Sequence, residues 1–166
     1  HVSYMDAVLV MGALPRPARF VMWYRIFELP LMNVVFRAAR AIPIAGAKED
    51  PALMEDAFAK IDAALASGEI VGIFPEGGLT KDGEIAQFRK GVERILAARP
   101  VPVIPMALCN MWGSMWSRRD SVMHRARMPR RFRAHVELRV GQAVAPELAT
   151  AEFLEAKVRE LRGEAR

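Results

Sequence analysis

Cysteine is almost absent from this sequence of 166 residues, in which Cys109 stands alone. A single thiol cannot form an internal disulfide, so the fold depends on its hydrophobic core and the chain suits a reducing compartment. Long apolar runs are missing too, because Arg, Lys, Glu or Pro interrupts each of them well before the roughly 20 residues that span a bilayer. We therefore expect no transmembrane helix within these residues.

Low-complexity linkers and internal repeats are also lacking. Hydrophobic residues make up 52% of the chain and charged residues 26%, which excludes a disordered segment. With 24 Lys and Arg against 19 Asp and Glu, the formal net charge is +5. No initiator Met precedes His1 and no signal-peptide pattern follows it. We expect residues 1–166 to form a single domain cut from a longer chain at its N-terminus.

Helical and strand-like periodicities alternate along the chain, which predicts an α/β fold. The clearest helix has Asp50 as its N-cap and Pro51 as its first residue, and ends at Gly68. A last amphipathic helix follows Thr150. Further helices are expected over 6–14, 29–40 and 90–98, and strands over 18–22, 41–45, 69–74, 101–108 and 132–140. This order predicts a mixed, mostly parallel sheet flanked by helices.

The first candidate for chemistry is His1, which lies five residues before Asp6. If a helix begins near Met5, an imidazole in the preceding loop can fold back onto the carboxylate. That pairing fixes the ring tautomer and leaves the other nitrogen free to take a proton from a hydroxyl. The spacing is consistent with half of a catalytic triad, and also with a helix-capping Asp beside a surface His.

The second candidate is the sequence Phe-Pro-Glu-Gly-Gly of residues 74–78, which directly follows a predicted strand. Ligands bind at the carboxyl ends of strands in open α/β sheets, and glycines leave room for a ligand to approach main-chain amides. The alternative is an ordinary turn with a solvated Glu. A third segment, Val-Pro-Val-Ile-Pro at residues 101–105, is more simply a core strand with prolines at its edge.

In this order and separation, the three segments resemble the glycerophospholipid acyltransferase superfamily, whose members carry a His-x4-Asp block, a Phe-Pro-Glu-Gly block and a Val-Pro-Val-Ile-Pro-like strand. The resemblance extends from His1 to about Leu108, and residues 88–91 (Phe-Arg-Lys-Gly) match a further Phe-basic-x-Gly element. Residues 19–22, 41–44 and 112–114 look most like the acyltransferase domains of bacterial bifunctional 2-acylglycerophosphoethanolamine acyltransferase/acyl-carrier-protein synthetases and their transporter fusions.

The resemblance implies a glycerol-3-phosphate acyltransferase-like fold. It implies an enzyme that moves a fatty acyl group from acyl-CoA or acyl-acyl-carrier protein to a hydroxyl of a lysophospholipid or glycerol phosphate. His1 would be the general base and Asp6 its orienting partner. No metal and no cofactor is implied, since the thioester is already activated. The residues expected to bind substrate are Phe74, Pro75, Glu76, Gly77 and Gly78, with Lys48 and Lys81.

Two positions depart from the family pattern. Members that bind a phosphate monoester commonly have Arg where this chain has Leu79, and a second Arg where it has Ala45 and Gly46. A dianionic monoester gains most from bidentate Arg, whereas a phosphodiester carries one charge and needs less. We therefore expect a lysophospholipid with a head group, such as lysophosphatidylethanolamine, as acceptor, with Lys48 or Lys81 partly replacing the missing arginines.

The basic residues form an early and a late group, each of which is either a solvated face or a working surface. In the early group, Trp23, Phe20 and Met22 lie among Arg16, Arg19 and Arg25. This mixture favours docking on an anionic membrane surface. Together with the resemblance it places the chain at the cytoplasmic face of the inner membrane, peripheral or tethered through flanking segments.

Two other functions remain as alternatives to an enzyme. The arginines of residues 125–133 are compatible with nucleic-acid binding. Zinc-ligand spacing, an RNP-like aromatic motif and a helix-turn-helix with a basic recognition helix are all missing, so we expect no nucleic-acid partner. A catalytically degenerate acyltransferase-like domain, acting as a lipid-binding or interaction module, is the other alternative.

Overall fold

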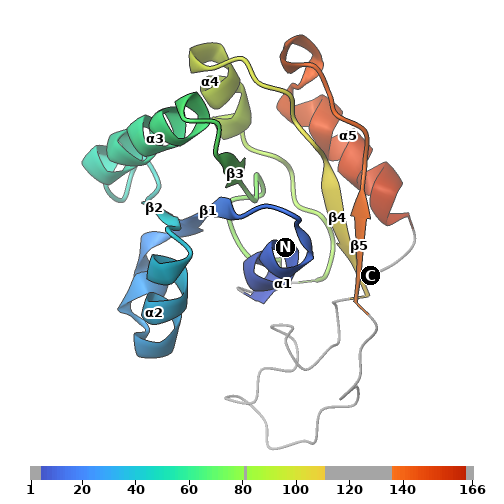
Figure 1. The fold of residues 1–166 in the computed structure, drawn as a ribbon. Helices are drawn as coiled ribbons and strands as arrows, with labels where there is room; N and C mark the ends of the chain where they lie inside the picture. Colours follow the sequence, from blue (N-terminus) through green and yellow to red (C-terminus); the bar gives the residue numbers. More distant parts are fainter. Residues whose placement is uncertain (1–4, 81, 111–135, 164–166) are drawn as a thin grey trace, which may run out of the picture. The chain divides into compact units, whose positions relative to one another are not determined.

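The structure is a computed structural model that describes residues 5–80, 82–110 and 136–163, apart from the side chains of residues 30–32 (Figure 1). The contacts divide the chain into two compact units. The first contains the described residues of His1–Ala13, Pro75–Glu93 and Val101–Arg166, and the second contains Leu14–Phe74 and Arg94–Pro100. The chain passes from the second unit into the first between Phe74 and Pro75.

The second unit contains a parallel three-stranded sheet. Strand β1 (Ala18–Trp23) lies between β2 (Ile42–Ile44) and β3 (Ile70–Gly72). Burial alternates along β1, because successive side chains point to opposite faces, and its buried residues are Ala18, Phe20 and Met22. Parallel strands joined through helices confirm the α/β class predicted from the sequence.

The helices of the second unit begin with the 3₁₀ turn η1 (Tyr24–Glu28) and the helix α2 (Pro30–Ala38). Helix α3 (Pro51–Ala66) starts as predicted, since the Asp50 carboxylate accepts a hydrogen bond of 2.9 Å from the Leu53 amide. Its buried residue Ile61 joins Ile42 and Ala57 in the hydrophobic core. Helix α4 (Gly91–Ala98) begins among residues of the first unit and ends among those of the second.

The first unit is built around an antiparallel strand pair. Strands β4 (Met106–Cys109) and β5 (Glu137–Val140) pair with Met106 opposite Val140. Helix α5 (Ala151–Arg162) packs along both strands (Figure 1), and the short turn η3 (Pro146–Leu148) precedes it. The Thr150 hydroxyl caps α5, as predicted, by accepting a hydrogen bond of 3.2 Å from the Phe153 amide.

Helix α1 (Met5–Ala13) contributes the buried residues Asp6, Ala7 and Val10 to the first unit. It lies one residue earlier than the helix predicted over 6–14. No helix within the described ranges is both long and apolar enough to cross a membrane.

The strand boundaries differ from the sequence prediction. The strand expected over 69–74 is the three-residue β3, and it is half-buried rather than buried. The strand expected over 101–108 begins only at Met106, because prolines at 102 and 105 have no N–H for a ladder; before it, Val103 forms an isolated bridge with Val144. Of the strand expected over 132–140, residues 132–135 lie outside the described ranges, and β5 begins at Glu137.

Candidate active site

The central element of the candidate site is the turn of residues 75–78, named here the motif turn. Residues 86–89, named the facing segment, bind it through two hydrogen bonds. The Arg89 amide donates to the Pro75 carbonyl at 2.8 Å, and the Ala86 amide donates to the Glu76 carboxylate at 2.9 Å. The Glu76 side chain is half-buried.

Gly77 has no Cβ, and the motif turn needs this for two reasons. Its φ of +68° lies in the left-handed region that glycine adopts most easily. A Cβ at this position would also lie 2.5 Å from Nε and 2.6 Å from Cζ of Arg89. The guanidinium of Arg89 therefore lies directly against the backbone of Gly77. At Gly78, by contrast, a Cβ would meet no atom within 4 Å.

Arg89 was not among the predicted site residues, although residues 88–91 had been matched to a Phe-basic-x-Gly element. Its side chain is exposed. Every other described arginine except Arg37 donates to a carboxylate or a carbonyl oxygen. The described residues supply no such acceptor to the Arg89 guanidinium. Only the fold reveals this position, since residues 77 and 89 are far apart in sequence.

Helix α5 holds the facing segment from the other side. Glu155 on α5 accepts a hydrogen bond of 2.9 Å from the Phe88 amide and pairs with Arg159 at 3.0 Å. Arg159 in turn donates to the Ile85 carbonyl at 2.6 Å. The hydrogen bond from Phe88, followed by that from Arg159, holds the pKa of Glu155 below its usual value of 4.5. Residues 85–88 are thus fixed by charged groups of α5.

The loop between the motif turn and the facing segment is internally hydrogen-bonded. The buried Thr80 hydroxyl donates to the Asp82 carboxylate at 2.7 Å and accepts from the Gly83 amide at 3.2 Å. The Asp82 carboxylate also accepts from the Glu84 amide at 3.0 Å. This arrangement is typical of a defined turn, in which short polar side chains satisfy backbone donors.

Asp6 lies in the first turn of α1, and its side chain is 1% exposed. The prediction that a helix begins near Met5 is confirmed. A carboxylate buried this deeply requires compensating donors or a cation. The positive end of the α1 dipole is one favourable influence on its charge. The pairing with His1 falls on a residue outside the described ranges and stays a prediction.

The remaining predicted site residues occupy different places. The Phe74 ring stacks on Phe20 with centroids 5.6 Å apart, so the ring has a packing role within the second unit. Lys48 is exposed in a turn between β2 and α3 of the same unit. Lys81 lies outside the described residues. The structure therefore joins Pro75, Glu76 and Gly77 to the facing segment and leaves the roles of the other residues as predictions.

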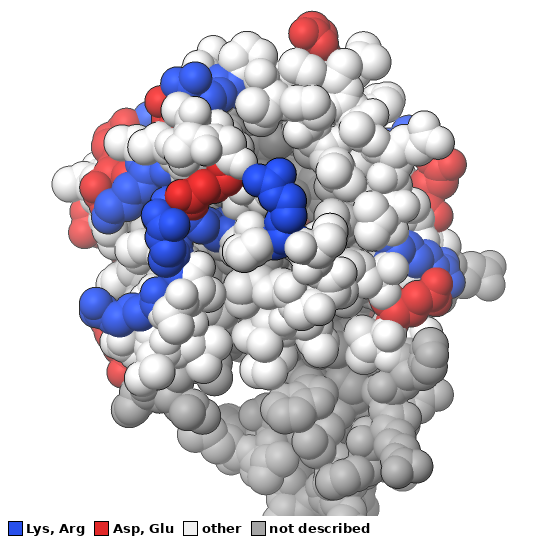
Figure 2. Space-filling model, viewed as in Figure 1, with Lys and Arg blue, Asp and Glu red and all other residues white. Residues whose placement is uncertain are grey.

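Two apolar residues of the early basic group are not at the surface. Phe20 and Met22 are core residues, 4% and 3% exposed. Arg16 donates to the Gly68 carbonyl and Arg19 pairs with Glu69, so both have structural partners. On the face drawn in Figure 2, Lys and Arg side chains gather at the left with Asp and Glu side chains among them. The expected docking role of Phe20 and Met22 is therefore wrong.

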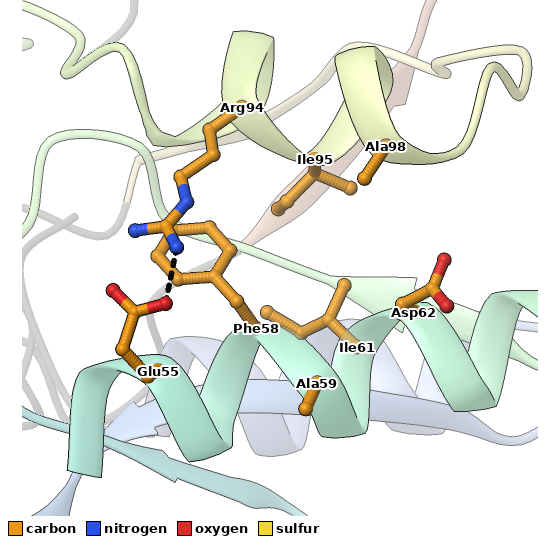
Figure 3. A pocket seen from close by; sticks show the side chains of 8 residues that line it. All are labelled: Glu55, Phe58, Ala59, Ile61, Asp62, Arg94, Ile95 and Ala98. Carbon is orange, nitrogen blue, oxygen red and sulfur yellow. Dashed lines mark hydrogen bonds and ion pairs between the residues drawn. The ribbon is translucent and has the colours of Figure 1, made fainter. Parts of the chain in front are cut away.

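A hollow of about 290 Å³ lies between α3 and α4 within the second unit. Figure 3 shows Arg94 extended over the Phe58 ring, 4.0 Å from its centroid, and paired with Glu55. Apolar side chains of both helices form its floor, and none of the predicted site residues lines it. The hollow is best explained as a packing groove whose rim is closed by ion pairs.

A reactive cysteine and a metal-binding cluster are two further features that could carry chemistry. Burial raises the pKa of the Cys109 thiol, which disfavours the nucleophilic thiolate. Within the described ranges, His, Cys, Asp and Glu side chains form no cluster of three or more that could hold a metal ion.

Comparison with known proteins identifies relatives of one kind. The family described as Acyltransferase matches residues 1–109. Over 108 residues the chain is 29% identical to "1-acyl-sn-glycerol-3-phosphate acyltransferase BAT2, chloroplastic" of Brassica napus and 28% identical to "1-acyl-sn-glycerol-3-phosphate acyltransferase LPAT1, chloroplastic" of Arabidopsis thaliana. Each alignment covers 65% of this chain and 30% of the relative, so the match spans under a third of those proteins.

The fold also matches a solved structure. The crystal structure of the 1-acyl-sn-glycerophosphate (LPA) acyltransferase PlsC from Thermotoga maritima aligns with a TM-score of 0.62 and 22% sequence identity. The alignment covers 96% of this chain and 59% of that one. The expected glycerol-3-phosphate acyltransferase-like architecture is therefore confirmed as a fold.

Replacing Gly77 with Ala tests the conformation of the motif turn. A left-handed φ costs an L-residue roughly 1–2 kcal/mol, so Gly77→Ala should lower the free energy of unfolding by about that amount. Gly78→Ala is the matched control, because that position has open space and no positive φ. Urea unfolding of both variants makes the comparison. Equal stability of the two variants would contradict the described turn.

The contact between Glu155 and Phe88 predicts a pH dependence. A lowered pKa contributes stability above the unfolded-state pKa, and this contribution is lost as the pH falls through the lower folded-state pKa. Glu155→Gln should therefore unfold more easily than the wild type by about 1 kcal/mol at neutral pH. The difference should shrink below the usual pKa of 4.5. Denaturant unfolding at pH 7 and pH 3.5 measures it, and a gap that widens in acid would refute the assignment.

Proposed function

This chain belongs to the Acyltransferase family, and we propose that it transfers a fatty acyl group from a thioester to a hydroxyl of a lysophospholipid. The observation that carries the proposal is the motif turn, which follows β3 and is fixed by the facing segment. The match over residues 1–109 includes this turn and the block from His1 to Asp6. The similar proteins of Brassica napus, Arabidopsis thaliana and Thermotoga maritima are all named as acyltransferases, which supports the same reaction class.

In the proposed reaction His1 acts as general base. It takes the proton of the acceptor hydroxyl while the oxygen attacks the thioester carbonyl, so that a carbon–oxygen bond forms and the carbon–sulfur bond breaks. The proton then passes to the departing thiolate, which leaves as a thiol. Positioning and stabilisation of the oxyanion account for the remaining barrier, because the thioester is already activated.

Asp6 is proposed to orient His1 and to stabilise its imidazolium. Its burial at the start of α1 supports this role, since a rigid, desolvated carboxylate interacts strongly with a cation that forms beside it. The motif turn is proposed to shape the acceptor site, with the Glu76 carboxylate fixed by the Ala86 amide. The acyl donor is acyl-CoA or acyl-acyl-carrier protein.

The acceptor is proposed to carry a phosphodiester head group, as in lysophosphatidylethanolamine. Leu79 and Ala45 occupy the positions where phosphate-binding arginines were expected, and the Ala45 side chain is buried. The absence of these arginines would weaken the binding of a dianionic phosphate monoester most, because such a group gains most from bidentate Arg. Lysophosphatidate is the second candidate acceptor, favoured by the printed names of the relatives.

Release of free thiol in the presence of each lysolipid tests the proposed reaction. The wild type should release thiol from acyl-CoA or acyl-acyl-carrier protein and acylate lysophosphatidylethanolamine faster than lysophosphatidate. Loss of a general base typically costs about 10²–10⁴-fold in rate, so His1→Ala should be slower by that factor. Lys60→Ala, an exposed change on α3, is the control.

Three outcomes separate the alternatives. Equal thiol release by the wild type and His1→Ala would remove His1 from the mechanism. Lysolipid binding without thiol release would indicate a degenerate lipid-binding module. A preference of the wild type for lysophosphatidate would select the second acceptor.

We further propose that η1 and α2 dock on an anionic membrane surface, at the cytoplasmic face of the inner membrane. Trp23, Leu29 and Val34 are exposed by 42%, 49% and 68%. Arg25 lies over the Trp23 ring at 5.3 Å, and Arg37 has no hydrogen-bond acceptor among the described residues. Exposed apolar side chains beside arginines suit a headgroup region, where each basic residue adds about 1 kcal/mol.

Liposome co-sedimentation tests this docking surface. Val34→Glu should weaken binding to vesicles that contain anionic phospholipid by about tenfold, since it replaces an apolar contact with a repelled charge. Leu148→Glu is the matched control, because Leu148 is 60% exposed on η3. A higher salt concentration should also weaken vesicle binding by the wild type. The proposal would be overturned if vesicle binding did not change with salt concentration, with anionic lipid content or with either substitution.

A further inference from the structure

We propose that Arg89 binds the phosphate group of the acceptor and supplies the charge that Leu79 and Ala45 do not. The inference rests on the proposed function, because it takes the motif turn as the acceptor site. The side chain lies against Gly77, with Nε and Cζ at 2.5 and 2.6 Å from where a Cβ would be. A guanidinium at this place borders any ligand that the motif turn receives.

The backbone of Arg89 is fixed before a ligand arrives. Its own amide donates to the Pro75 carbonyl at 2.8 Å, and the amide of the preceding Phe88 donates to Glu155 at 2.9 Å. The first bond ties the backbone of Arg89 to the motif turn, and the second ties the preceding residue to α5. Such preorganisation reduces the conformational entropy lost on binding.

The guanidinium has no structural task to explain its place. The other described arginines, Arg37 apart, are held by carboxylates or carbonyls, whereas none of the described residues accepts from Arg89. An exposed guanidinium with unused donors matches the oxygen atoms of a phosphate. Lys90, the next residue, is also exposed and adds positive charge near the start of α4.

The number of charges fits the acceptor class. A phosphodiester carries one negative charge, which one guanidinium balances through two parallel hydrogen bonds. The Glu76 carboxylate is the nearest acid in the motif turn, and it accepts a hydrogen bond from the Ala86 amide. Its presence disfavours a second negative charge on the ligand and so acts against a phosphate monoester.

Two measurements on the purified protein test the role of Arg89. The first is isothermal titration calorimetry with short-chain lysophosphatidylethanolamine below its micelle concentration, and separately with coenzyme A. The second is steady-state acyl transfer. Arg89→Gln should weaken lysolipid binding and raise its KM by roughly tenfold or more, with kcat and the donor KM within about twofold.

Two further variants serve as controls. Arg89→Lys keeps the charge but not the paired donors, so its affinity should fall between the wild type and Arg89→Gln. Lys157→Gln removes one positive charge from α5 and should leave both ligands unaffected. Thermal unfolding of each variant shows whether the fold is kept. If Arg89→Gln does not fold, the test is the comparison of lysolipid affinity between Arg89→Lys and the wild type.

The outcomes distinguish this inference from the proposed function. Equal lysolipid affinity of the wild type and Arg89→Gln overturns the inference, and so does a wild type that binds no lysolipid. Loss of coenzyme A binding without loss of lysolipid binding assigns the guanidinium to the donor and overturns it too. A wild type that binds lysolipid through Arg89 but transfers no acyl group refutes only the proposed function.

Discussion

Two hydrogen bonds between the motif turn and the facing segment are the constraint on which the candidate site depends. The Pro75 carbonyl and the Glu76 carboxylate are both satisfied by amides of the facing segment. Without these bonds, a turn that contains two consecutive glycines would sample many conformations. With them, the Glu76 carboxylate and the backbone of Arg89 are held in place relative to the motif turn.

Arginines have two different physical tasks in this chain. Most of the described ones pair with carboxylates that keep some exposure to solvent. Arg94 lowers the pKa of Glu55 in this way, and Arg99 that of Asp62. Exposed pairs of this kind stabilise little, because solvent screens them. Stability comes instead from the buried apolar core around Ile61. Arg37 and Arg89 are the described arginines that pair with neither a carboxylate nor a carbonyl, and it is the donors of Arg89 that we propose bind the acceptor.

Local signals carried most of the prediction from sequence. The caps at Asp50 and Thr150 were correct because a side-chain oxygen and its target amide lie three residues apart. Helix existence and the parallel class followed from periodicity. Strand ends were wrong where proline removed a ladder donor. Phe20 and Met22 were expected on a docking surface as well as in a strand, and their burial in β1 rules out the surface role. The contact of Arg89 with Gly77 depends on tertiary structure and left no local trace.

The hydrogen bond from Phe88 to Glu155 joins residues 67 positions apart. Its acceptor lies beyond residue 109, where the match to the family ends. The residues matched to the family are therefore fewer than the residues that hold the motif turn and the facing segment in place. Substitutions on α5 far from any motif can consequently alter the site, and a fragment trimmed to the matched residues would keep every motif while losing the support of its facing segment.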